Sequence, residues 1–202
     1  MLTEAVTGLI LGLVGLAATN VDNFVVLVSA FGARKESKPV VCLGFTAGAM
    51  IILGISLMFS LVGELIPVRY LGYLGVVPIY LGVRELTQSA LQKRKPPSLP
   101  ENPWKNTLKG IIAVSLITLA GGTDTLAVIA PLLAESHVVG FWAICVGYAI
   151  AVMGVATLLG YAVSHPAIAG PLQHHGSRIG PAVMIFIGSY IFLNTATDRV
   201  TG

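Results

Sequence analysis

The chain has 202 residues, of which 55% are hydrophobic and only 10% are charged, and its mean hydropathy is +0.85. Soluble domains carry about 25% charged residues, so this composition excludes an ordinary soluble domain and indicates an integral membrane protein with the lipid bilayer as its surroundings. A net charge of +3 can indicate a nucleic-acid partner, but here the basic residues cluster in short segments between apolar runs. Membrane topology explains that clustering, and we expect no nucleic acid to bind.

The first apolar run, residues 2–31, carries polar side chains near its middle, at Thr19, Asn20, Asp22 and Asn23. Spanning a bilayer takes about 20 residues, so we expect this longer run to be tilted, broken or unwound at the polar stretch. A carboxylate at that depth costs about 2.5–3.5 kcal/mol on insertion scales if it faces lipid. Because acidic residues inside membrane segments are by default functional, Asp22 is the first candidate site residue.

Two more apolar runs complete the first half. Residues 40–63 contain no charge, and residues 70–85 form a third predicted helix with Pro78 at its centre. A proline at that place kinks a membrane helix and frees a carbonyl group. Residues 89–105 are polar, basic and proline-rich, which predicts an extended cytoplasmic linker. This linker divides a single membrane transport domain into a first repeat over 1–88 and a second over 106–202.

The second half begins with a similar pattern. The run 109–133 contains the pair Gly121-Gly122, followed by Thr123, Asp124 and Thr125. Adjacent glycines cost about 1 kcal/mol each in a helix interior relative to alanine, so they predict a helix break just before Asp124, the second candidate site residue. Residues 138–164 and 178–197 supply two further predicted helices.

The two halves correspond at three places in the same order. Because each half has three predicted helices, an odd number, the second half is inserted upside down relative to the first, as in many secondary transporters. The predicted fold is therefore an all-α integral membrane protein of six transmembrane helices in two inverted three-helix repeats, with one midplane site. The matched segments are Asp22 with Asp124, Gly44-Phe45 and Met50 with Gly147-Tyr148 and Met153, and Ile79–Gly82 with Ile185–Gly188.

The basic residues predict the orientation. If the connection after the first helix is cytoplasmic, 10 of the 12 Lys and Arg residues lie in cytoplasmic connections or beside them, and only Arg69 and Arg199 lie outside. By the positive-inside rule we expect a multi-pass protein of the cell membrane, plasma or inner, with both termini extracytoplasmic.

The residue types at the two polar stretches indicate a cation site. Carboxylate, amide and hydroxyl oxygens suit hard divalent ions such as Mn²⁺, Mg²⁺ or Ca²⁺. A soft ion prefers sulfur, and the matched Met50 and Met153 are possible soft ligands, although packing is the simpler interpretation for both. We expect a divalent cation as transported substrate, no cofactor, and exchange against protons, because the site is acidic and no ATP-binding motif is present. The candidate oxygen ligands are Asp22, Asp124, Asn20, Asn23, Thr19, Thr123 and Thr125.

Other functions remain open at this stage. Two aspartates on separate membrane helices also form the active site of intramembrane aspartyl proteases. Those enzymes have a Gly-x-Gly-Asp pattern at one aspartate, and Gly121-Gly122-Thr123-Asp124 does not match it. We therefore expect no enzymatic activity. Export of an amino acid or of another small cation is the alternative, and the glycine-rich helix faces would allow a homodimer without requiring one.

Three segments resemble one known family. Residues 18–27, Ala-Thr-Asn-Val-Asp-Asn-Phe-Val-Val-Leu, are similar to the first-helix signature of the CadD-type cadmium resistance transporters within the LysE exporter superfamily. Residues 77–83 resemble the third helix of that family, and residues 121–125 followed by Pro131 resemble its fourth-helix motif. The resemblance implies export of a divalent cation driven by an ion gradient. The chain differs from the family in having Thr125 where the family has asparagine, and in lacking a glutamine within residues 44–48.

Overall fold

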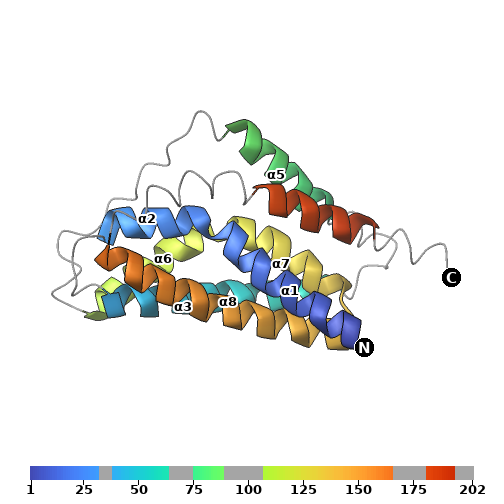
Figure 1. The fold of residues 1–202 in the computed structure, drawn as a ribbon, viewed down its shortest axis with the longest axis horizontal. Helices are drawn as coiled ribbons and strands as arrows, with labels where there is room; N and C mark the ends of the chain where they lie inside the picture. The colour runs from blue at the N-terminus through green and yellow to red at the C-terminus, as the bar shows by residue number, and fades with distance from the viewer. Residues whose placement is uncertain (32–37, 64–74, 89–106, 166–180, 194–202) are drawn as a thin grey trace.

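A computed structural model describes residues 1–31, 38–63, 75–88, 107–165 and 181–193, and within these ranges the chain is helical and contains no strand. This confirms the predicted all-α class for the described part of the chain. Figure 1 shows the arrangement. The helices are α1 (Leu2–Thr19), α2 (Val21–Phe31), α3 (Lys38–Gly63), α5 (Val76–Gln88), α6 (Thr107–Gly121), α7 (Thr123–Glu135), α8 (Val138–Ser164) and a last helix, Pro181–Leu193.

Three of these helices are long and apolar enough to cross a membrane: Leu2–Thr19, Lys38–Leu61 and Val138–Val163. The pair α6 and α7 forms a fourth candidate span that is bent by 66°. Helix α5 has 13 residues and Pro181–Leu193 is similarly short. At 1.5 Å per residue, 13 residues extend for about 20 Å, less than the roughly 30 Å hydrocarbon core.

The six-span layout stays a prediction, because segments 64–74, 166–180 and 194–202, which flank the two short helices, lie outside the described residues. The predicted linker, residues 89–105, lies outside them as well. Helix α8 begins and ends where the sequence predicted, at Val138 and Ser164. Pro78 lies in the first turn of α5, where its missing amide hydrogen breaks no helical bond. The residues before Gly75 are not described, so the predicted kink at Pro78 is untested.

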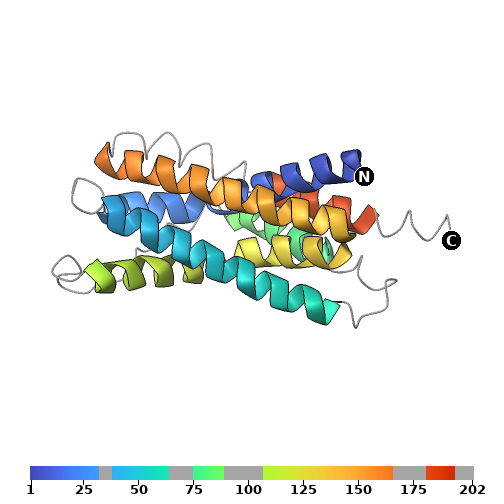
Figure 2. The same ribbon diagram turned by 90° about the horizontal axis from the view of Figure 1, so that it is seen from below.

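The helices pack in an order that interleaves the two halves. Helix α1 runs along α8, α3 runs along α6 and α7, and α3 also contacts α8 (Figures 1 and 2). Tyr148, Phe45 and Leu16 are among the largest side chains that are fully buried between them. Large apolar side chains such as Phe59, Trp142 and Phe186 remain exposed, as expected where helices face lipid.

Glycines allow the closest of these contacts. A methyl group built on Gly147 of α8 would lie against the carbonyl oxygen of Leu9 in α1. A methyl group on Gly44 of α3 would lie 2.9 Å from the carbonyl oxygen of Ile111 in α6. Each glycine thus lets two helix backbones touch directly, which is how small residues favour association inside a bilayer.

Replacing Gly147 with alanine should push α8 away from α1. Overpacking of a close contact typically costs about 1–3 kcal/mol, so we expect a lower melting temperature and a lower folded yield in detergent. Gly154 lies on the same helix, and no atom of another described segment lies within 4 Å of the corresponding position, so Gly154→Ala should be neutral or slightly stabilising. Equal melting temperatures for the two variants would contradict this packing.

Tyr148 adds a polar contact to the same core. Its hydroxyl group donates a 2.8 Å hydrogen bond to the carbonyl oxygen of Ala49, joining α8 to α3. At the matched position of the first half the residue is Phe45, which is fully buried without a hydroxyl group. The hydroxyl group is therefore present at only one of the two matched positions.

Candidate functional site

Two helix breaks form the centre of the candidate site. Helix α1 ends at Thr19 and α2 begins at Val21, while α6 ends at Gly121 and α7 begins at Thr123. One residue separates the helices in each case, and its backbone angles are nearly the same: φ −99° and ψ 6° at Asn20, φ −85° and ψ 5° at Gly122.

The hydrogen bonding after each break is also the same. The amide of Phe24 donates to the carbonyl oxygen of Asn20 at 2.9 Å, and the amide of Leu126 donates to that of Gly122 at 2.9 Å. The two breaks, 102 positions apart, therefore agree in backbone angles and in the bond that follows. They differ before the break, where the amide of Asn20 donates to Leu16, four residues back, and that of Gly122 donates to Leu119, three residues back. Breaks were expected near residues 20–23 and at 121–122, and the chain breaks at one residue in each region.

The breaks touch each other through a polar cluster, which consists of Thr19, Asn20, Asn23, Thr118 and Thr125. The hydroxyl oxygens of Thr19 and Thr125 lie 2.8 Å apart, and Nδ2 of Asn20 donates to Oγ1 of Thr125 at 2.9 Å. Asn23 donates from Nδ2 to Oδ1 of Asn20 at 3.2 Å and to the carbonyl oxygen of Thr118 at 3.4 Å. These bonds link α1 to α7, and α2 to α6.

Counting hydrogens fixes the direction of the bond between the two hydroxyl groups. Thr19 has one hydroxyl hydrogen, and its Oγ1 lies 2.8 Å from the carbonyl oxygen of Gly15, which can only accept. That hydrogen is used there, so Thr125 donates to Thr19. The chain of bonds then runs from the Asn20 amide to Thr125, from Thr125 to Thr19, and from Thr19 to Gly15.

The polar cluster is buried. Thr118 and Thr125 are 0% exposed, Asn20 is 1%, Asn23 is 3% and Thr19 is 7%. Within the described residues, every buried side-chain nitrogen and oxygen atom has a hydrogen-bond partner. Burying a polar group without a partner costs several kcal/mol, so this complete pairing lets the cluster exist between apolar helices.

Gly121 makes room for the contact between the breaks. A methyl group on Gly121 would occupy the place of Oδ1 of Asn23, and one on Gly122 would collide with the end of the Ile52 side chain of α3. The two glycines were predicted as a helix break. They also form a notch that receives an amide from α2 and an isoleucine from α3.

The two acidic residues hold equivalent places. Asp22 is the second residue of α2, and Asp124 is the second residue of α7. Both therefore lie in the first turn of a helix, where the positive end of the helix dipole favours a negative charge. Asp124 is half-buried and Thr123 is exposed. The side chain of Asp22 lies outside the described set, but its neighbour Asn23 contacts the second break.

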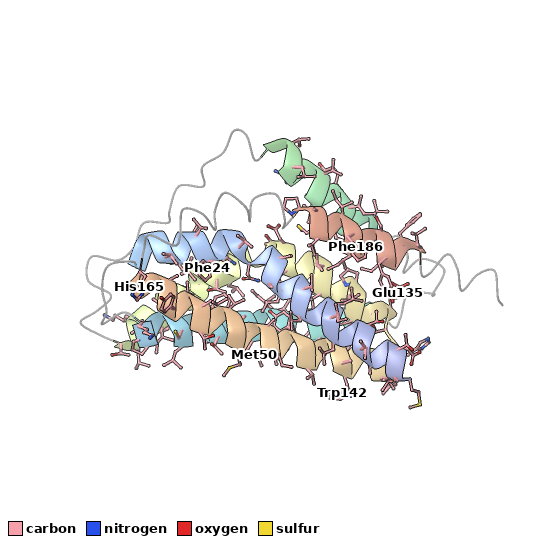
Figure 3. All side chains as sticks on the ribbon, viewed as in Figure 1. Phe24, Met50, Glu135, Trp142, His165 and Phe186 are labelled. Carbon is pink, nitrogen blue, oxygen red and sulfur yellow. The ribbon has the colours of Figure 1, made fainter. Side chains whose placement is uncertain are left out.

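The methionines occupy a different position. Met50 is 47% exposed on α3 and Met153 is 63% exposed on α8, and Met50 points outward from the helices in Figure 3. Among the described residues, no three His, Cys, Asp or Glu side chains gather as a metal site.

Sequence reasoning missed Thr118. Its carbonyl oxygen accepts from Asn23, and its own hydroxyl group donates to the carbonyl oxygen of Val114 at 3.0 Å. The available signal was a polar residue one turn before Gly121 inside an apolar run. The same signal occurs at several serines and threonines that bond to their own helix, such as Ser56, whose hydroxyl group donates to the carbonyl oxygen of Ile52, so it does not select Thr118.

Comparison with known proteins finds one matching family model. A family model described as cadmium resistance transporter matches residues 16–200, which include both breaks and all helices from the end of α1 onward. No curated protein and no solved structure matches the chain.

Proposed function

The chain belongs to the cadmium resistance transporter family, and from its two helix breaks we propose that it exports a divalent cation through a site that contains Asp22 and Asp124. The family resemblance inferred from the sequence is thereby confirmed, and the protein is a membrane transporter of the metal-efflux type. One observation supports the finer proposal: two breaks with nearly the same backbone angles contact each other, and each is followed by an aspartate in the first turn of the next helix.

We propose the inverted repeat as the architecture of this site. A methyl group on Gly82 would lie 2.7 Å from the carbonyl oxygen of Pro181, and one on Gly188 would lie 2.6 Å from that of Gly75. Adding the offset of 106 positions to Gly82 gives Gly188, and subtracting it from Pro181 gives Gly75, so the two contacts are related by exchanging the halves. Such reciprocal contacts between α5 and Pro181–Leu193 support a pseudo-twofold relation between the halves.

The choice of ion follows from the ligands and the family. Two carboxylates offset the charge of a divalent cation, and neutral oxygens at the breaks complete a shell of six or more ligands, which suits Mn²⁺ or Ca²⁺. The family points to Cd²⁺, an ion that prefers sulfur. We therefore propose a divalent cation as substrate and let transport measurements select among Cd²⁺, Mn²⁺ and Ca²⁺.

We expect the purified protein in proteoliposomes to take up a divalent cation and to release protons in exchange. Carboxylates must be deprotonated to bind a metal, so binding displaces protons. The interior should become more alkaline as metal enters, and an acidic interior should accelerate uptake. The measurement follows Cd²⁺, Mn²⁺, Ca²⁺ and lysine side by side with a pH-sensitive dye inside the vesicles.

The possible results of this experiment distinguish the alternatives. Uptake of lysine without metal uptake would favour an amino-acid exporter and would overturn the proposed substrate. Metal flux that leaves the internal pH unchanged and ignores an imposed pH gradient would rule out proton exchange. Empty liposomes made from the same lipid serve as the control.

We propose that both termini face outward from the cytoplasm, on the strength of the 10-to-2 distribution of basic residues. In a variant without Cys42 and Cys145, a cysteine at Thr3 or Gly202 should react with an impermeant thiol reagent added to intact cells. A cysteine at Ser98 should react only after the cells are opened. Labelling at Ser98 alone in intact cells would reverse the orientation.

A further inference from the structure

The polar cluster joins the two halves of the chain at the level of the proposed site. Thr19 and Asn20 belong to the first half, and both bond to Thr125 in the second half at 2.8 and 2.9 Å. These two bonds cross between the breaks, and Asp22 and Asp124 each lie two residues after a break in the sequence. A change in this contact would therefore change the separation of the two aspartates.

The bonding capacity of these three side chains is almost fully used. Asn20 donates one amide hydrogen to the carbonyl oxygen of Leu16 at 3.2 Å and one to Thr125, and its Oδ1 accepts from Asn23. Thr125 accepts from Asn20 and donates to Thr19, which donates in turn to Gly15. With exposures of 0–7%, the remaining lone pairs do not face solvent.

We propose that Thr19, Asn20 and Thr125 form a lock that positions the two helix breaks and does not itself ligate the cation. The proposal rests on the proposed function, and it narrows the ligand set expected from the sequence. A cation approaching one of these oxygens would have to displace a hydrogen bond inside a closed cluster. The two carboxylates, by contrast, bear the charge that attracts the cation.

Metal dependence separates a positioning residue from a ligand. Loss of a ligating hydroxyl oxygen should weaken binding of Ca²⁺ and Mn²⁺, which prefer oxygen, more than binding of Cd²⁺. Loss of positioning changes the geometry before any metal arrives, so it should weaken all three ions by the same factor. Changes at groups that support metal ligands typically reduce affinity by about 10-fold to 100-fold.

The test compares Thr125→Val, which keeps the shape and removes the hydroxyl group, with Thr125→Ser, which keeps the hydroxyl group. Calorimetry on the purified full chain gives the dissociation constants of Cd²⁺, Mn²⁺ and Ca²⁺. We expect a uniform loss of about 10-fold or more in Thr125→Val and recovery in Thr125→Ser. Thr46→Val is the matched control, because among the described residues the Thr46 hydroxyl group bonds only to the carbonyl oxygen of Cys42 in its own helix.

The outcomes are distinct. A loss for Ca²⁺ and Mn²⁺ that spares Cd²⁺ would make Thr125 a ligand and overturn the proposal, as would an unchanged affinity in Thr125→Val. If the wild-type protein bound none of the three ions, the proposed function would fail. A metal-free unfolding cycle of Thr19→Val, Thr125→Val and the double variant then tests the lock by itself: coupling between the two sites supports it, and additive effects overturn it.

Discussion

Asp124→Asn should abolish cation transport while leaving a folded, detergent-stable protein. Asparagine has nearly the same shape as aspartate and lacks its charge, so the variant loses half of the charge that offsets a divalent cation. Asp124 is half-buried at the beginning of α7, two residues after the break at Gly122. We expect the loss in metal uptake to exceed the roughly 100-fold change that supporting residues produce.

Asp22→Asn should have the same effect, and the double variant should be no worse than either single one, because residues that act as a unit are not additive. Uptake of Cd²⁺ and Mn²⁺ into proteoliposomes gives the rates, and gel filtration reports folding. Glu4→Gln is the control, since Glu4 is exposed and pairs with the N-terminal amine at 3.2 Å. Calorimetry gives the number of metal ions bound per chain. If each single variant still bound half as many ions as the wild-type protein, the two carboxylates would serve separate sites and the model of one shared site would fail.

The helices and their breaks could be predicted because they depend on local composition. The boundaries of α8 at Val138 and Ser164 follow from an uninterrupted apolar run between two polar residues. The breaks at Asn20 and Gly122 follow from polar residues and paired glycines in runs that are otherwise apolar. In each case the information lies within a few residues of the feature.

The contacts within the site could not be predicted, because they join positions about a hundred residues apart. From the sequence, Thr19 and Thr125 are two candidate ligands. Nothing in the sequence indicates that their hydroxyl oxygens lie 2.8 Å apart although the residues are 106 positions apart. It also leaves the role of Thr118 unstated, since a threonine in an apolar helix bonds equally well to its own backbone. Packing of α1 and α2 against α6 and α7 decides these pairings.

Gly121 contributes both to a local helix break and to a contact between distant parts of the chain. Its low helix propensity predicts a break, and this much is local. Its second role is steric, because Oδ1 of Asn23 lies where a side chain at position 121 would begin. A glycine is therefore needed at position 121 for the contact with α2 as well as for the end of α6.

Gly121→Ala should separate the two breaks. The added methyl group displaces the Asn23 amide, which then loses its bonds to Asn20 and to the carbonyl oxygen of Thr118. We expect a cost of about 1–3 kcal/mol from overpacking, with more from the buried amide, and a fall in melting temperature of about 2–4 °C for each kcal/mol. Metal uptake should fall as well, since the aspartates depend on the same contact.

The clash with Asn23 can be tested through a second substitution. Asn23→Ala removes the amide that the new methyl group displaces, so Gly121→Ala should cost less in the Asn23→Ala background than in the wild-type protein, and the two effects should not add. Gly54→Ala is the control, because no atom of another described segment lies within 4 Å of the corresponding position on α3. Additive losses of stability would show that Gly121 is needed only for its helix-breaking backbone and that the notch for Asn23 contributes nothing.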